Sequence, residues 1–240
     1  MPDGADHRGK GPAEPRRRIP VWDLPTRLFH WTLAFLFVVQ WISGSLGKLD
    51  LHIRVGEAIL TLIIFRIAWG LVGSRHSRFV DFLVAPRTAL AHFRETLAVM
   101  RHGPSAARPQ PHLGHTELGG YMIVLMLLLL LVQAGAGLFA TDEIVTDGPL
   151  NHLVSSSVAK LLTSLHSLLA TLLLILVLVH ISAALFYLLR KRENLILPLI
   201  TGRAMLPPQS TAHDTGFASP WLALALLVAS AALVWGIISL

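Results

Sequence analysis

Four of the twelve histidines fall within or at the ends of apolar segments, where an ionisable side chain is costly. They are His30, His52, His166 and His180. Residues of this kind inside a membrane usually face the interior of a helix bundle and serve a function. Helix-capping or interfacial roles are the alternative and would suit His30 and His52, at segment ends. The set of four instead predicts ligation of a redox centre.

His166 and His180 share one apolar segment and lie 14 residues apart. In an α-helix this spacing corresponds to about 21 Å along the axis. The rotation is about 1400°, only about 40° short of four full turns. Both imidazoles therefore lie on one helix face, one toward each leaflet of a membrane. A helix with two imidazoles at this separation suits two stacked haems.

The composition excludes several other classes of protein and of redox centre. The chain has no cysteine, which excludes disulfides, thiolate-held iron–sulfur clusters and covalently attached c-type haem. Of its 240 residues, 53% are hydrophobic and only 14% charged, whereas a soluble domain has about 25% charged residues. We therefore expect a compact all-α membrane bundle.

Five segments are long and apolar enough to span a hydrocarbon core, which requires roughly 20 residues. They cover residues 28–46, 53–72, 120–140, 161–189 and 220–239. The first contains aromatic residues and no small-residue cleavage site, so we interpret it as an uncleaved signal anchor. The sequence predicts a four-helix transmembrane bundle with a fifth, C-terminal transmembrane helix.

The distribution of charge predicts the orientation of these spans. Basic residues cluster before the first span, between the second and third, and between the fourth and fifth, whereas the other two loops are mainly acidic. The positive-inside rule then places the N-terminus in the cytoplasm and the C-terminus in the periplasm. Because the basic residues flank apolar runs, they indicate membrane orientation and lipid contact rather than a nucleic-acid partner.

With this orientation the histidines pair by depth in the membrane. His30 and His180 lie toward the cytoplasmic face, and His52 and His166 toward the outer face. Two neutral imidazoles fill both axial positions of a haem iron, so no position remains open for dioxygen or substrate. Such a site changes only its oxidation state. Two of them stacked across the bilayer form a path for electrons.

Three stretches resemble one known family. Residues 21–31 (VWDLPTRLFHW) resemble the opening of the bacterial cytochrome b561 and nickel–iron hydrogenase b-type cytochrome family, with His30 as its first haem ligand. Residues 65–73 (FRIAWGLVG) resemble its motif at the end of the second span, and His166 and His180 match its paired ligands. Residues 115–120 (HTELGG) are similar to its loop before the third span, with Thr116-Glu117 where the family usually has Asn-Pro. The resemblance covers about residues 20–203.

The resemblance implies two haem b groups and a function. Members of the family commonly link a hydrogenase, a formate dehydrogenase or a c-type cytochrome to quinone, and some act alone on superoxide or quinol. We therefore expect an electron-transfer subunit in the respiratory chain of a bacterial inner membrane, with quinone as substrate and a periplasmic or membrane-associated redox partner. The resemblance also implies a quinone pocket near His180, Gly119 and Gly120.

Three arginines and a glycine are further candidates for the haem sites. Arg27 lies one turn before His30, and Arg54 lies two residues after His52, so both can pair with anionic haem propionates. The positive-inside flank is an equal alternative for Arg27. Arg66 lies deep in the second span and must pair or reach the cytoplasm. Gly56, one turn after His52, would leave room for a flat ring or for close helix packing.

The chain divides into three regions. Residues 1–19 form a basic tail that we expect to be disordered. Residues 20–203 form the di-haem domain, which includes a basic cytoplasmic loop at 74–118 with an amphipathic surface helix at about 87–100. Residues 204–240 comprise a linker and the fifth span.

Two other functions fit parts of the pattern. A stand-alone oxidoreductase acting on superoxide or quinol would need no partner subunit. A haem-free transporter or membrane anchor would leave the four histidines unexplained, and neither internal repeats nor broken helices of the transporter kind are evident.

Overall fold

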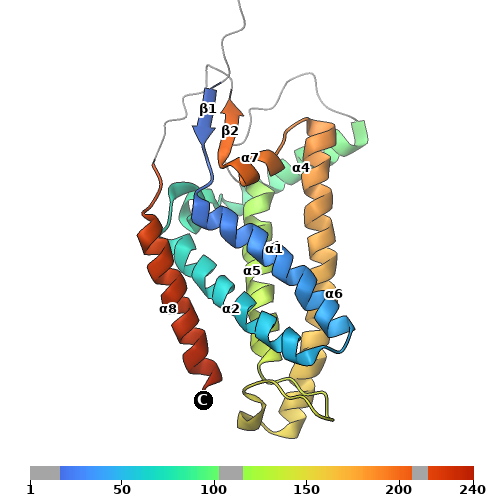
Figure 1. Ribbon diagram of the computed structural model, residues 1–240. Coiled ribbons are helices and arrows are strands. Elements are labelled where there is room, and N and C mark those ends of the chain that lie inside the picture. Colours follow the sequence, from blue (N-terminus) through green and yellow to red (C-terminus); the bar gives the residue numbers. More distant parts are fainter. Residues whose placement is uncertain (1–16, 103–115, 207–215) are drawn as a thin grey trace, which may run out of the picture.

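Five long helices dominate the computed structural model, which describes residues 17–102, 116–206 and 216–240 (Figure 1). They are α1 (Leu24–Ser45), α2 (Leu49–Val72), α5 (Glu117–Gly137), α6 (Ser156–Phe186) and α8 (Pro220–Ile238). All five are long and apolar enough to cross a membrane. The prediction of five spanning helices is confirmed.

Shorter elements lie at the two ends of these helices. One end, here called the sheet end, carries strands β1 (Arg17–Pro20) and β2 (Arg203–Leu206), the 3-10 turn η1 (Arg75–Ser77), α3 (Phe79–Phe82), α4 (Pro86–His102) and α7 (Ile196–Thr201) (Figure 1). The opposite end, the loop end, carries residues 138–155 with the 3-10 turn η2 (Asn151–Leu153). Helices α1, α5 and α8 begin at the sheet end, and α2 and α6 begin at the loop end (Figure 1).

Helices α1, α2, α5 and α6 all begin three to five residues before the apolar segments expected from the sequence. Helix α1 begins at Leu24, where the Asp23 carboxylate accepts a hydrogen bond from the Thr26 amide at 2.8 Å and Pro25 occupies the first turn. Helix α6 begins at Ser156 and continues into a π-helical turn, η3 (Tyr187–Lys191). Hydropathy alone therefore places the start of these helices too late in the chain.

Four of the long helices share one apolar core. Val55, Ile59 and Ile63 of α2 pack with Leu130 of α5 and Leu173 of α6, and α1 adds partly buried apolar side chains. Ile63 and Leu173 are almost completely buried. Leu173 lies midway along the chain between His166 and His180, so this core separates the two ends of the bundle.

The fifth long helix, α8, packs on the outside of this bundle against α2. Ala223 joins a second core with Phe29, Phe65, Trp69 and Leu127. The chain entering α8 is held by a hydrogen bond from the Ala218 amide to the Ser74 hydroxyl at 3.0 Å. The other faces of α8 carry exposed apolar side chains such as Trp221 and Trp235, as expected for a helix in contact with lipid.

A small antiparallel sheet joins the chain before α1 to the chain after α7. Arg17 pairs with Leu206 and Pro20 with Arg203. The amides of Val21 and Trp22 then both donate to the Gly202 carbonyl. Residues 17–19 therefore form a strand, although we expected them to be disordered; residues 1–16 lie outside the described part. The expected boundaries at 19/20 and 203/204 both fall within this sheet.

The sheet end also contains a buried polar network. The Asp23 carboxylate accepts hydrogen bonds from Trp69 Nε1 and from the Ser77 hydroxyl, both at 3.1 Å. Arg66 donates to the Ser77 carbonyl at 3.1 Å, and Thr26 bonds the Ser77 hydroxyl at 2.7 Å. All five residues are almost completely buried. The network connects the start of α1, the end of α2 and η1.

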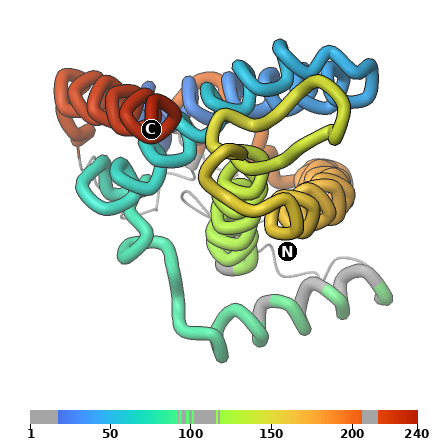
Figure 2. Tube along the Cα trace, turned by 90° about the horizontal axis from the view of Figure 1, so that it is seen from below, coloured from blue at the N-terminus to red at the C-terminus, as the bar shows by residue number. Residues whose placement is uncertain are grey.

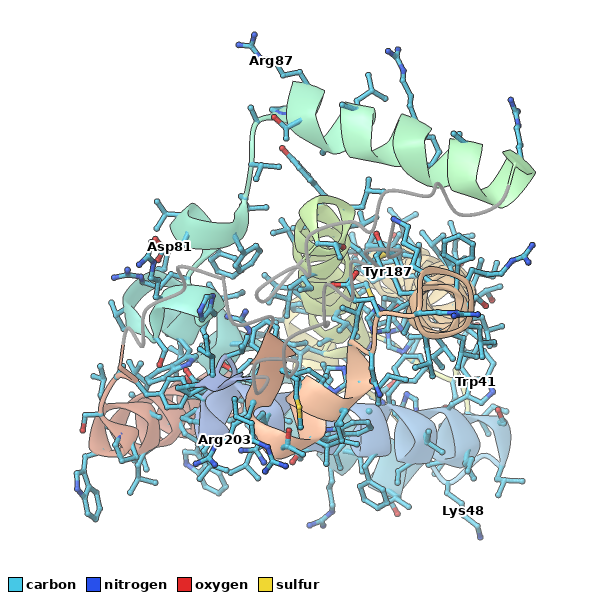
Figure 3. All side chains as sticks on the ribbon, turned by 90° about the horizontal axis from the view of Figure 1, so that it is seen from above. Trp41, Lys48, Asp81, Arg87, Tyr187 and Arg203 are labelled. Carbon is cyan, nitrogen blue, oxygen red and sulfur yellow. The ribbon has the colours of Figure 1, made fainter. Side chains whose placement is uncertain are left out.

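Helix α4 lies across the sheet end, beside the bundle rather than within it (Figure 2). Arg87, Arg94 and Arg101 are exposed, and Arg87 points away from the bundle (Figure 3). Leu90 and Phe93 are exposed apolar residues on the same helix. This is the expected helix within residues 74–118, and residues 103–115 of that loop lie outside the described part.

Candidate functional site

The structure brings the four histidines together in the two expected pairs. His30 on α1 faces His180 on α6 near the sheet end, with ring centroids 6.3 Å apart and ring planes at 50°. His52 on α2 faces His166 on α6 near the loop end, with centroids 6.0 Å apart and planes at 77°. We call these the sheet-end pair and the loop-end pair.

The spacing within each pair fits two imidazoles that share one metal ion. A metal–imidazole bond is about 2 Å long and a ring nitrogen lies about 1 Å from the ring centre, so two rings on opposite sides of an ion have centroids roughly 6 Å apart. Two rings in direct hydrogen-bond contact would be closer. Both pairs match the spacing that a shared ion requires.

The donor set favours a metal held in a macrocycle over a bare ion. No group of three or more histidine, aspartate or glutamate side chains suited to a metal occurs in the described residues. Each pair therefore offers only two ligands, whereas a structural zinc ion takes four. A haem supplies four in-plane nitrogens itself and needs only two axial ligands from the protein. The pairs fit that requirement.

Hydrogen bonds orient both rings of the loop-end pair. His52 Nδ1 donates to the Gln40 carbonyl at 3.0 Å, and His166 Nδ1 donates to the Gln133 carbonyl at 2.9 Å. Because a carbonyl only accepts, the proton lies on Nδ1 in both rings. Nε2 of each ring then has a free lone pair, and through this lone pair Nε2 can bind a metal.

The sheet-end pair is built differently. Nδ1 of His30 is buried and has no hydrogen-bond partner among the residues that the structure describes. Nδ1 of His30 thus lacks the carbonyl contact that Nδ1 of each loop-end ring makes.

The arginine candidates have different surroundings. Arg27 donates to the Ile200 carbonyl at the end of α7, and its buried Nε atom has no partner among the described residues. Arg54 is exposed on α2. Arg66 belongs to the buried network through Ser77 and lies over the rings of Phe29 and Phe79.

The glycine candidates lie against protein side chains. A Cβ at Gly56 would lie 3.3 Å from Gln40 Nε2, and a Cβ at Gly120 would lie 3.0 Å from the Phe82 ring. The Gly119 amide donates to the Thr116 hydroxyl at 3.1 Å. Thr116 thus caps the start of α5.

Sequence reasoning missed the carbonyls that orient the loop-end pair. A signal was present: glutamine is followed four residues later by glycine at Gln40–Gly44 and again at Gln133–Gly137. Both glycines lie against a histidine ring. Backbone carbonyls carry no sequence signature of their own, so the role of these segments became visible only in three dimensions.

The family model described as prokaryotic cytochrome b561 matches residues 21–202. A probable Ni/Fe-hydrogenase B-type cytochrome subunit from Bradyrhizobium diazoefficiens is 25% identical over 123 residues, which are 43% of this chain and 49% of that protein. A protein of the same name from Cupriavidus necator is 26% identical over 129 residues, which are 45% of this chain and 52% of that protein.

A third protein of the same name, from Rhizobium leguminosarum bv. viciae, is 24% identical over 160 residues, covering 58% of this chain and 66% of that protein. The chain thus spans about half to two thirds of the length of these relatives. No solved structure matches the chain significantly. The family model covers most of the chain, including all four histidines, and so the chain belongs to the prokaryotic cytochrome b561 family, as a multi-pass membrane protein.

Proposed function

We propose that this protein is a membrane cytochrome b that passes electrons between the quinone pool and a partner redox protein through two haem b groups. The observation that carries the proposal is the presence of two histidine pairs, each with ring centroids about 6 Å apart, at opposite ends of one helix bundle. His30 and His180 would hold one haem, and His52 and His166 the other. Each haem, when bound, supplies a one-electron iron couple without an open axial position.

The protein would position the two haems and exclude water between them. His166 and His180 are about 21 Å apart along α6, so the edges of two macrocycles would be much closer than the irons. The buried layer around Ile63 and Leu173 fills the space between the two levels with apolar side chains. This layer would exclude water from the electron path and fix the distance between the two haems.

Charge supports an orientation of the sheet end toward the cytoplasm. The basic residues of α4, η1 and the segment after α6 gather there, whereas the loop end carries Asp142, Glu143 and Asp147. The positive-inside rule places the first group in the cytoplasm. The loop-end pair would then serve the outer face of a bacterial inner membrane and the sheet-end pair the inner face.

The names of the relatives suggest the class of partner. Because three of them are named as hydrogenase cytochrome subunits, we infer a hydrogenase-like donor at the loop end and quinone at the sheet end, near His180, Gly119 and Gly120. Arg54 and the unpaired Nε atom of Arg27 would pair with haem propionates, and Gly56 would leave room beside the loop-end haem. The observed contacts of Arg66 indicate support of the sheet-end network instead.

Electron transfer can be tested with the whole chain in proteoliposomes. An impermeant one-electron donor, reduced viologen, is added outside, and quinol formation is measured; each quinone takes two electrons from two donors and two protons from water. We expect quinone reduction with the wild-type chain and at least a tenfold loss with His166→Ala or His180→Ala. The exposed His152 provides the control His152→Ala, which should retain the rate.

Any of three results would overturn the proposal. Equal rates in all four proteins would show that the histidine pairs carry no electrons. A colourless wild-type protein would instead support a haem-free transporter or anchor. If the isolated chain passes electrons from superoxide to quinone, or from quinol to a small-molecule acceptor, without any partner protein, the protein is a stand-alone oxidoreductase instead of a subunit.

A further inference from the structure

We propose that two matching residue pairs, Gln40 with Gly44 on α1 and Gln133 with Gly137 on α5, are positioning clamps for the loop-end histidines and make the loop-end haem the one of lower reduction potential. This inference rests on the proposed binding of a haem by each histidine pair. It assigns a function to residues outside the ligand set, and it gives the electron path a direction.

The first clamp consists of the Gln40 carbonyl and the space left by the missing side chain of Gly44. In an α-helix the carbonyl of residue 40 points toward the amide of residue 44. His52 Nδ1 donates to the same Gln40 carbonyl at 3.0 Å, and the Ser43 hydroxyl donates to it at 3.1 Å. A Cβ on residue 44 would lie only 3.0 Å from both Cε1 and Nδ1 of the His52 ring. The imidazole can therefore approach the carbonyl at this distance because residue 44 is glycine.

The second clamp repeats this arrangement on another helix. His166 Nδ1 donates to the Gln133 carbonyl at 2.9 Å. A Cβ on Gly137 would lie 2.9 Å from His166 Cε1 and 3.1 Å from Nδ1. In both clamps the glutamine Oε1 atom is also buried without a partner among the described residues. Three features thus recur on α1 and α5: a carbonyl that accepts from a histidine Nδ1, a glycine against the same ring, and a buried glutamine Oε1 atom.

The hydrogen bonds have a chemical consequence for the iron that these rings would hold. A histidine that donates its Nδ1 proton to a carbonyl is a more basic ligand through Nε2. A more basic ligand stabilises the ferric state over the ferrous state and so lowers the reduction potential. Both loop-end rings have this bond, whereas His30 of the sheet-end pair has none among the described residues.

The clamps therefore favour electron flow from the loop end toward the sheet end. An electron that enters at the loop-end haem moves to the haem of higher potential, and the reverse step is uphill. This deepens the proposed function, because it makes the loop end the donor side.

The test compares two alanine variants on the same helix. In Gly137→Ala the new methyl group meets the His166 ring, whereas in Gly135→Ala it meets nothing within 4 Å. Both changes replace a glycine in α5 by a better helix former. Each protein is purified with its haems, the potential of each haem is measured by redox titration, and the low-spin ferric signals are recorded by electron paramagnetic resonance. His30→Ala, which keeps only the loop-end haem, assigns the signals.

We expect the loop-end haem of the wild-type protein to titrate below the sheet-end haem. Gly137→Ala should raise the potential of the loop-end haem and shift its resonance signal, with the sheet-end haem unchanged. Gly44→Ala should do the same through His52, and Gly135→Ala should match the wild type. Loss of the loop-end haem in Gly137→Ala, with the sheet-end haem retained and Gly135→Ala intact, also supports the clamp.

Two results would overturn the inference while leaving the proposed function intact. In one, the wild-type protein binds two haems and the loop-end haem has the higher potential. In the other, Gly137→Ala and Gly135→Ala have identical potentials and resonance signals. Absence of haem from the wild-type protein is a different outcome, because it contradicts the proposed function itself.

Discussion

At the scale of single residues, the histidines depend on neighbours that ligand chemistry alone does not reveal. His30 follows Phe29, which is buried in the core shared with Trp69 and α8. Trp69 in turn donates to Asp23, the residue that caps α1 one and a half to two turns before His30. The position of His30 on α1 is therefore supported by a buried carboxylate that lies outside the histidine pairs.

Removing that carboxylate should destabilise the protein. Asp23→Ala removes the cap of α1 and leaves the Trp69 Nε1 and Ser77 hydroxyl donors without their acceptor, a loss of about 2–4 kcal/mol. We expect a clearly lower melting temperature in detergent. Asp50→Ala, which removes an exposed carboxylate from the first turn of α2, should have little effect. Equal melting temperatures of the two variants would contradict a structural role for the network.

At the scale of elements, α6 carries one ligand of each pair and packs against its neighbours at the middle. Leu173 is 1% exposed, within the core formed with α2 and α5. Because lipid is as apolar as this core, the core stabilises the bundle by close packing more than by removal of apolar surface from water. Loss of side-chain volume at this level should therefore leave a cavity between the two histidine pairs.

Leu173→Ala tests this view of the bundle. The cavity should cost about 1–3 kcal/mol, less than in a soluble core because lipid competes equally for the side chain. We expect a lower melting temperature with both haems still bound. Leu168→Ala, on an exposed part of the same helix, is the matched control. A melting temperature as high as that of the control would mean that α6 is not packed through Leu173.

Much of this arrangement could be predicted from the sequence. The apolar segments and the spacing of His166 and His180 predicted the five helices and both histidine pairs, because helix geometry fixes depth and face. The strands β1 and β2 could not be predicted, since they pair residues 17–20 with 203–206, far apart in the chain. The partner of Arg66 could not be predicted either, because it is the backbone carbonyl of Ser77, and a backbone carbonyl has no sequence signature.

At the scale of the whole molecule, the two ends differ in charge and in structure. The sheet end holds the strands, α7 and the basic helix α4, and the loop end is a compact acidic loop (Figure 1). In that loop, Asp142 accepts hydrogen bonds from the amides of Ile144, Val145 and Thr146, which lower the pKa of its carboxyl group. The carboxylate therefore stays charged on the side assigned to the periplasm.

The absence of native cysteine allows a direct test of orientation. Val145 at the loop end and Val80 at the sheet end are 87% and 78% exposed. In spheroplasts, an impermeant maleimide should label Val145→Cys at once and Val80→Cys only after lysis. The unsubstituted chain should remain unlabelled. Labelling of Val80→Cys in intact spheroplasts would reverse the orientation and, with it, the sides assigned to quinone and partner.

The number and ligation of the haems is the central claim, and spectroscopy of the purified protein tests it most directly. We would record oxidised and dithionite-reduced visible spectra, with a pyridine haemochrome count, for the wild type, His166→Ala and His180→Ala. The account predicts two b-type haems in the wild type, loss of about one in each variant, and a reduced spectrum that carbon monoxide leaves unchanged. A colourless protein, or a haem content that does not respond to either substitution, would contradict it.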